Sequence, residues 1–132
     1  MKNKTDETTP QSFKTDGPTN TPLVEMDLNT YISQIKQQTS WPVSDRDSVT
    51  IFKSENMRIV LIGLRENAVI KTHSANGIIS VQILEGKIHF TTEQKTVSLE
   101  KGQMIALHEK IPHSVVAVQE SFFLLTLAMS NR

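Results

Sequence analysis

The stretch "KTHSANGIISVQILEGKIHF", residues 71–90, decides the fold class of this chain. Residues 78–84 and 87–92 are rich in β-forming side chains, and turn residues stand at both ends of the first run. Strand side chains alternate between two faces, and in the first run one face is apolar: Ile79, Val81 and Ile83. The stretch therefore predicts two strands with a shared apolar side, and it places His73 just ahead of them.

The turn at Glu85-Gly86 predicts how these two strands meet. As a two-residue hairpin turn it would pair Val81 with Phe90 and Gln82 with His89. Phe90 would then lie on the inner, apolar face. His89 would point away from the interior.

The same alternation of β-rich segments and turn signals extends from about residue 48 to the end of the chain. Nine such segments follow one another with no helical period between them, which leaves no room for helical crossovers. The segments are "SVTIF", "MRIVLIGL", "AVIKTH", "IISVQILE", "KIHFTT", "KTVSLE", "QMIAL", "HSVVAV" and "SFFLLTLAM". The pattern predicts an all-β antiparallel sandwich or closed barrel.

The first part of the chain has a different character. Residues 1–22 hold few large apolar side chains, so we expect a flexible tail ahead of one domain at residues 23–132. Apolar residues at helical spacing predict one helix at about residues 28–38, with Asp27 as its N-cap. Pro42 should end it, and Trp41 is expected to close one end of the core.

Composition excludes several functions. Lys plus Arg and Asp plus Glu each number 14, so no net field favours nucleic acid or an anionic membrane. There is no cysteine, so any metal would be bound by His, Asp, Glu or water. No segment resembles a signal peptide or a membrane span, and we expect a cytoplasmic protein.

The phrases "ILEGKIHF" and "GQMIALHEKIPHSV" give the chain a resemblance to the cupin superfamily over roughly residues 58 to 128. Cupins are small jelly-roll β-barrels whose two motifs bring metal ligands to the barrel mouth. The first motif usually supplies His-x-His and a Glu between turn glycines, and the second supplies a Gly, a Pro-x-Gly turn and a third His. The corresponding positions here are Asn67, His73, Ala75, Ile79 and Gly86, then Gly102, His108, Lys110, His113 and Ala117.

By this resemblance the turns are kept and the metal ligands are depleted. Of the usual three histidines and one glutamate, only His73 and His113 remain, because Ala75 and Ile79 replace the others. Two histidines leave most of a coordination sphere to water. We expect no cofactor, with a weakly held divalent metal (Zn, Ni, Mn or Fe) on His73 and His113 as the alternative. His108 is a further candidate ligand, since a loop could turn it inward.

Three functions follow from these expectations. The first is binding of a small molecule in an apolar barrel with a polar pole. Its expected pocket comprises His73, Ile79, Val81, Ile83, Phe90, His113 and Val115. The second is a metal-dependent cupin enzyme, an oxygenase or isomerase using His73 and His113. The third is a non-catalytic structural or regulatory dimer whose barrel is filled by its own side chains.

The last β segment bears on oligomeric state. From Phe122 to Leu127 it is apolar on both faces, which predicts a strand covered on both sides. A second subunit could supply one of these covers, and cupins often dimerise. We therefore expect a homodimer.

Overall fold

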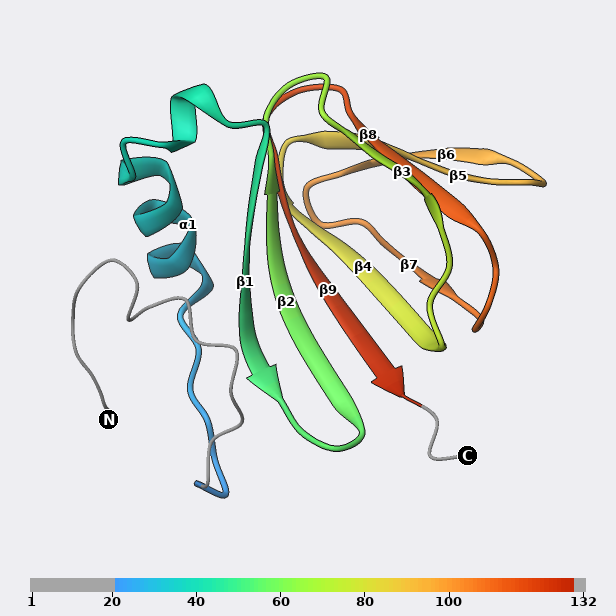
Figure 1. Ribbon diagram of the computed structural model, residues 1–132, viewed down its shortest axis with the longest axis horizontal. Coiled ribbons are helices and arrows are strands. Elements are labelled where there is room, and N and C mark those ends of the chain that lie inside the picture. The colour runs from blue at the N-terminus through green and yellow to red at the C-terminus, as the bar shows by residue number, and fades with distance from the viewer. Residues whose placement is uncertain (1–20, 130–132) are drawn as a thin grey trace.

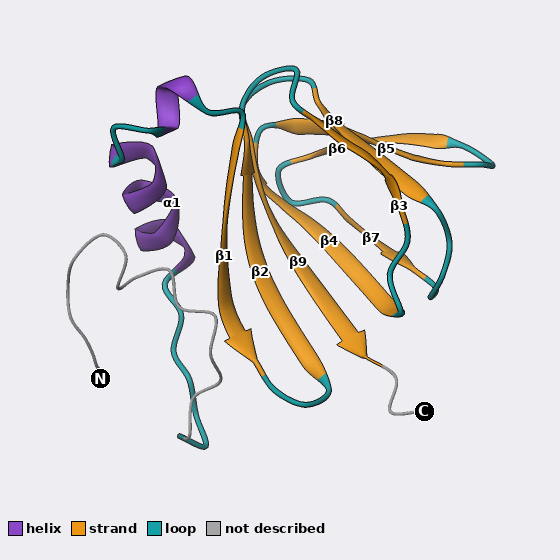
Figure 2. Ribbon diagram, in the orientation of Figure 1, coloured by secondary structure: helices purple, strands orange, loops and turns teal. Residues whose placement is uncertain are grey.

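The fold consists of two antiparallel sheets packed face to face, with a helix on the outer side of the larger sheet (Figures 1 and 2). The computed structural model describes residues 21–129. Among these residues the larger sheet has the strand order β1-β2-β9-β4-β7 and the smaller one β3-β8-β5-β6. The strands are β1 (Arg46–Lys53), β2 (Met57–Leu64), β3 (Val69–His73), β4 (Gly77–Glu85), β5 (Lys87–Thr92), β6 (Thr96–Glu100), β7 (Met104–Leu107), β8 (His113–Ala117) and β9 (Ser121–Met129).

All nine predicted strands are present, and the predicted all-β fold is confirmed. The predicted pairing across Glu85-Gly86 is wrong. Strand β4 pairs with β7 and β9, whereas β5 pairs with β6 and β8, so this turn takes the chain from one sheet to the other. Beyond the turn, the backbone N–H of Lys87 donates to the hydroxyl of Ser121, which holds the start of β5 against β9.

The predicted faces are nevertheless correct. Val81 and Phe90 are both buried between the sheets, while Gln82 and His89 are exposed. Alternation along a strand fixes which side chains share a face, whichever strand lies beside it. The central core comprises Leu64, Ala68, Ile79, Val81, Ile83, Ile88, Phe90, Leu99, Val115, Ala117 and Phe123.

A second apolar cluster lies on the other side of the larger sheet, under the helix α1 (Leu28–Gln37). Asp27 caps this helix, since its carboxylate accepts a hydrogen bond from the backbone N–H of Thr30 at 3.2 Å. Ile32 and Ile35 pack against Phe122 of β9 in this cluster. The helix thus supplies the second cover of β9 at Phe122, where the sequence had suggested another subunit.

Trp41 closes this cluster as predicted. It lies in the short 3-10 helix η2 (Trp41–Val43), which follows α1, and it is buried. Its indole Nε1 donates to the carboxylate of Glu120 at 3.2 Å, and its ring lies 5.4 Å from the Phe122 ring, centroid to centroid. The expected tail falls almost wholly on residues 1–20, outside the described residues. Within residues 21–129, no helix is long and apolar enough to cross a membrane.

Candidate functional site

The site is built where two loops connect the sheets at the same end of the sandwich. One loop runs from His73, the last residue of β3, to Gly77 at the start of β4. The other runs from Leu107, the last residue of β7, to His113 at the start of β8. The backbone N–H of Lys110 donates to the carbonyl of Ala75 at 2.8 Å, which ties the two loops together.

His73 and His113 meet at this end because they are partners in the β3–β8 register. Their ring centroids are 4.4 Å apart, with the ring planes inclined at 57°. The His113 ring also stacks on Phe90, with 5.3 Å between centroids and 12° between planes. His113 is buried, at 4% exposure, whereas His73 is exposed. The pair therefore joins the apolar interior to the surface.

Both rings use the same nitrogen for a backbone contact. Nδ1 of His73 lies 2.9 Å from the carbonyl oxygen of Lys71, and Nδ1 of His113 lies 2.9 Å from that of Ile111. A carbonyl can only accept, so the hydrogen sits on Nδ1 in each ring. In a neutral imidazole the lone pair is then on Nε2, which is free to accept a hydrogen bond or to bind a metal.

Burial sets the charge state of the inner histidine. Removal from water lowers the pKa of His113 below its ordinary value of 6.5. The hydrogen bond to Ile111 opposes this shift, and the neighbouring His73 adds to it. The His113 ring is consequently neutral at pH 7.

The residues present do not fit a tightly held metal. Over residues 21–129, no group of three or more His, Cys, Asp or Glu side chains is placed to hold an ion. His108 is exposed in the loop after β7 and is not assembled with the other two histidines into such a group. Two Nε2 atoms alone are short of the three or four protein ligands of stable sites.

The apolar side chains expected to line a pocket are buried in the central core. Each of them is at most 4% exposed: Ile79, Val81, Ile83, Phe90 and Val115. Other apolar residues that face the interior remain partly exposed. Leu107 and Leu127 flank Ile79 in the sheet register, and Ile70 flanks Val115.

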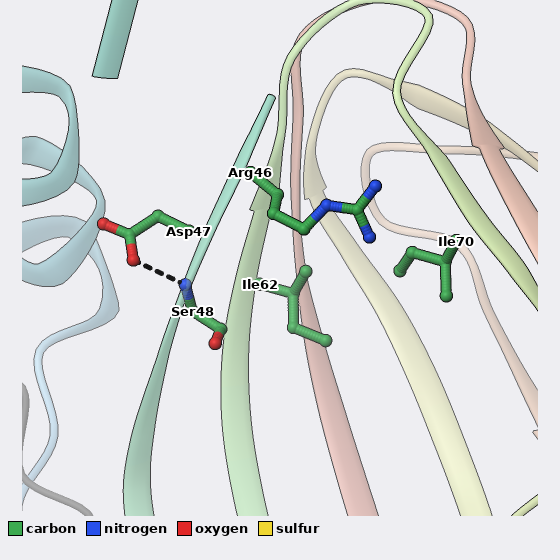
Figure 3. A pocket seen from close by; sticks show the side chains of 5 residues that line it. All are labelled: Arg46, Asp47, Ser48, Ile62 and Ile70. Atoms are coloured by element: carbon green, nitrogen blue, oxygen red, sulfur yellow. Dashed lines mark hydrogen bonds between the residues drawn. The ribbon is translucent and has the colours of Figure 1, made fainter. Parts of the chain in front are cut away.

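A cavity of about 350 Å³ lies at the edge of the sandwich between β1, β2 and β3 (Figure 3). Ile62 of β2 and Ile70 of β3 point toward each other across it. Its other lining residues are Arg46, Asp47 and Ser48. The sequence did not single out this cavity, because the three strands meet only in the folded chain.

Arg46 joins the two sheets at this edge. Its guanidinium donates to the backbone carbonyl of Val69 at 2.6 Å, so β1 of one sheet is linked to β3 of the other. The same guanidinium donates to both carboxylate oxygens of Asp45, at 3.1 and 3.2 Å. This hydrogen-bonded pairing lowers the pKa of Asp45 and raises that of Arg46. The Arg46 cation therefore has a carboxylate partner beside it, in an exposed ion pair.

The turn positions of the sequence motifs are kept in the backbone. Asn67, Gly86 and Gly102 have φ values of 72°, 89° and 88°, in the left-handed region. Lys110 has a φ of 65°, which is uncommon for a residue with a side chain. It stands at the position of the glycine in the second motif described above, and a glycine would adopt this φ without steric cost.

No protein-family model matches the chain, and no curated protein matches it. Several solved structures do match the chain. A conserved protein of unknown function from Streptococcus pyogenes is 29% identical with a TM-score of 0.62, over 66% of this chain and 76% of that one. An RmlC-like cupin protein from Desulfovibrio desulfuricans is 26% identical with a TM-score of 0.58, over 63% of this chain and 81% of that one.

Another solved structure matches over more of the chain. A cupin superfamily protein from Desulfitobacterium hafniense has a TM-score of 0.68, covering 88% of this chain and 97% of that one. It is 15% identical, so its likeness is one of fold.

Proposed function

Because the chain is a member of the cupin superfamily, we propose that it binds a small, mainly apolar molecule that carries a hydrogen-bond donor, at the end of the sandwich where His73 and His113 meet. The observation that carries this proposal is the commitment of both Nδ1 atoms to backbone carbonyls. Each of the two adjacent rings then keeps an Nε2 lone pair that can accept a hydrogen bond. A hydroxyl or amine group on a ligand would complement them.

The surroundings of the pair favour a ligand with an apolar body. Partly exposed apolar side chains face the interior on both sheets, Leu107 and Leu127 on one and Ile70 on the other. Small-molecule sites combine such walls with a few placed polar groups. The cavity between Ile62 and Ile70 adds free volume next to the strand that carries His73.

The test is a thermal-shift screen with two matched probe sets. One set contains small apolar alcohols, phenols and amines, and the other contains hydrocarbons of the same shape without the donor. We expect donor-bearing probes to raise the melting temperature of the wild-type protein and hydrocarbons to raise it less. The shift should be lost in His73→Ala and kept in His89→Ala and His108→Ala, which remove exposed histidines elsewhere. Equal shifts in all three variants would contradict the proposal.

A metal measurement separates this function from the enzyme alternative. The protein is purified without a histidine tag, and its metal content is measured together with that of the His73→Ala/His113→Ala variant. We expect less than stoichiometric metal in both. A stoichiometric metal that disappears in the double variant would favour a metal-dependent oxygenase or isomerase instead. If no probe of either set shifts the melting temperature, the filled barrel of a structural protein becomes the better account. A cytoplasmic location stays a prediction of the sequence.

A further inference from the structure

The chain passes from β3 into β4 through an Asn-Gly pair, Asn76-Gly77 (Figure 1). The other six asparagines of the sequence are each followed by a residue with a side chain. Asn76 is exposed, and within residues 21–129 its side chain takes part in no hydrogen bond. The side-chain amide is therefore free to change rotamer and to approach the backbone that follows it.

Close packing requires the glycine at position 77. Gly77 is buried, and a Cβ atom at this position would clash with the carbonyl oxygen of Ala128 on β9. That oxygen belongs to the backbone of a paired strand, so it cannot move aside for a side chain. The fold thus places after Asn76 the residue that shields its own backbone nitrogen least.

The sheet does not hold the backbone N–H of Gly77. Gly77 is paired with Met129 of β9, but the Met129 N–H donates to the carbonyl of Asn56 on the β2 side, at 2.8 Å. The N–H and C=O of one strand residue point to the same side, so Gly77 and Met129 exchange no hydrogen bonds. On its other side β4 pairs with β7, which ends at Leu107, opposite Ile79. Gly77 lies two residues beyond that point, so its nitrogen is outside both ladders.

We propose that Asn76 is a site of spontaneous deamidation, in which the backbone nitrogen of Gly77 attacks the side-chain Cγ of Asn76. In the first step the N–Cγ bond forms and the Cγ–Nδ2 bond breaks, and ammonia leaves with the proton of the Gly77 amide. The product is a five-membered succinimide ring. Water then opens the ring at either carbonyl, which gives aspartate or isoaspartate at position 76. In isoaspartate the main chain runs through Cβ and Cγ.

The isoaspartate product changes the loop beside His73, because it adds one methylene group to the main chain between Ala75 and Gly77. Both neighbours are held in place. The Ala75 carbonyl accepts from the backbone N–H of Lys110 at 2.8 Å, and Gly77 is packed against the Ala128 carbonyl. The added length must break the contact between the two loops or shift the start of β4. This proposal is independent of the ligand proposed above.

The test measures deamidation residue by residue in the full-length protein. The protein is kept at pH 8 and about 37 °C for several weeks in water enriched in oxygen-18, then digested and mapped by mass spectrometry. We expect the peptide with Asn76 to gain the label and to split into two products, because ring opening takes its oxygen from the solvent. Asn56 and Asn67 are the internal controls, since both are exposed and are followed by Met57 and Ala68. Asn76 should react at least tenfold faster than either.

A second comparison asks whether the folded loop permits the reaction. The rate at Asn76 is also measured in the chain unfolded in guanidinium chloride, and the rate in the folded protein should lie within tenfold of it. Asn76→Gln, whose side chain would have to form a larger ring, should give no product at this position.

Hydrogen exchange measures the effect on the loops. Exchange at the Lys110 amide should be faster in the aged wild-type protein than in the fresh one. Freshly purified Asn76→Asp is the matched control, because it adds the charge without the longer main chain, and it should keep the slow exchange. Unchanged exchange at Lys110 in protein that contains isoaspartate would show that the loops stay joined.

Three outcomes would overturn the proposal itself. These are a rate at Asn76 less than tenfold above both control asparagines, a product without oxygen-18, and a folded rate more than tenfold below that of the unfolded chain. All three are measured on the wild-type protein, so they do not depend on the folding of any variant.

Discussion

His113 lies buried beneath an exposed His73, with the two ring centroids 4.4 Å apart across the β3–β8 pair. The same phenylalanine that fills the core, Phe90, stacks on the inner ring. The arrangement places one imidazole in an apolar environment and lets the other reach water. The charge state of His113 therefore affects both the stability of the fold and the binding of any ligand.

The first prediction concerns the dependence of stability on pH. Burial lowers the pKa of His113, so in the acidic range the unfolded chain binds a proton that the folded one does not. Stability should accordingly be full above pH 6.5 and should fall as the pH drops from 6.5 toward the folded-state pKa of His113. Urea unfolding at steps between pH 8 and pH 5 measures this.

The matched variants for this prediction are His113→Phe and His89→Phe. The first replaces the buried ring with one that cannot bind a proton, so its stability should fall less between pH 7 and pH 5 than that of the wild-type protein. The second changes an exposed ring and should keep the wild-type slope. Parallel slopes in wild type and His113→Phe would show that other groups govern the acid range.

The second prediction compares two glycines with nearly the same φ angle. Gly86 and Gly102 both have φ near 90°, but a Cβ atom at Gly86 would meet the carbonyl of Glu120 and the hydroxyl of Ser121, whereas at Gly102 it would meet open space. Gly102→Ala should cost about 1–2 kcal/mol of the free energy of unfolding, from left-handed strain alone. Gly86→Ala should cost clearly more. Equal losses in urea unfolding would mean that the contact at Gly86 relaxes freely.

The third prediction concerns Lys110, which adopts a φ of 65° between the two loops. Lys110→Gly should raise the free energy of unfolding by about 0.5–1 kcal/mol, because relief of left-handed strain exceeds the entropic cost of glycine. Lys110→Ala keeps the strain and removes only the side chain, so it should show no such gain. Chemical denaturation of the three proteins side by side checks this, and a stabilised Ala variant would point to the charge instead.

The fourth prediction concerns Ser121, a fully buried hydroxyl where the sheets join. It accepts from the backbone N–H of Lys87 at 2.9 Å, and carbonyls of Gln119 and Lys87 lie within its donor range at 2.7 and 3.1 Å. Ser121→Ala leaves that N–H unsatisfied and should cost about 1–3 kcal/mol. Ser98→Ala, at an exposed position of β6, should stay within about 0.5 kcal/mol of wild type in urea unfolding.

At the turn Glu85-Gly86 the sequence predicted the faces of the two strands correctly but not their pairing. Alternation correctly placed Val81 and Phe90 on the inner side and His89 on the outer side. It could not reveal that Gly86 turns the chain into the other sheet, since a glycine with positive φ serves a hairpin and a corner alike. Contacts with Glu120 and Ser121, more than thirty residues away, accompany the corner.

The candidate site likewise has features that the sequence predicted and features that it did not. His73 and His113 could be selected from motif spacing, and the structure brings them together. Their common use of Nδ1 could not be predicted, because it depends on how each ring folds back onto a carbonyl two residues earlier. The cavity between Ile62 and Ile70 was missed for a similar reason. Its walls come from two different sheets, and no local pattern links them.

The sequence by itself determined the nine strands, the capped helix and the inward or outward direction of most side chains. Those properties follow from periodicity and turn chemistry, which act over a few neighbouring residues. Only the tertiary structure decided which strands pair and that α1 covers β9 at Phe122. These properties depend on contacts between residues far apart in the chain, where several arrangements satisfy the same local pattern.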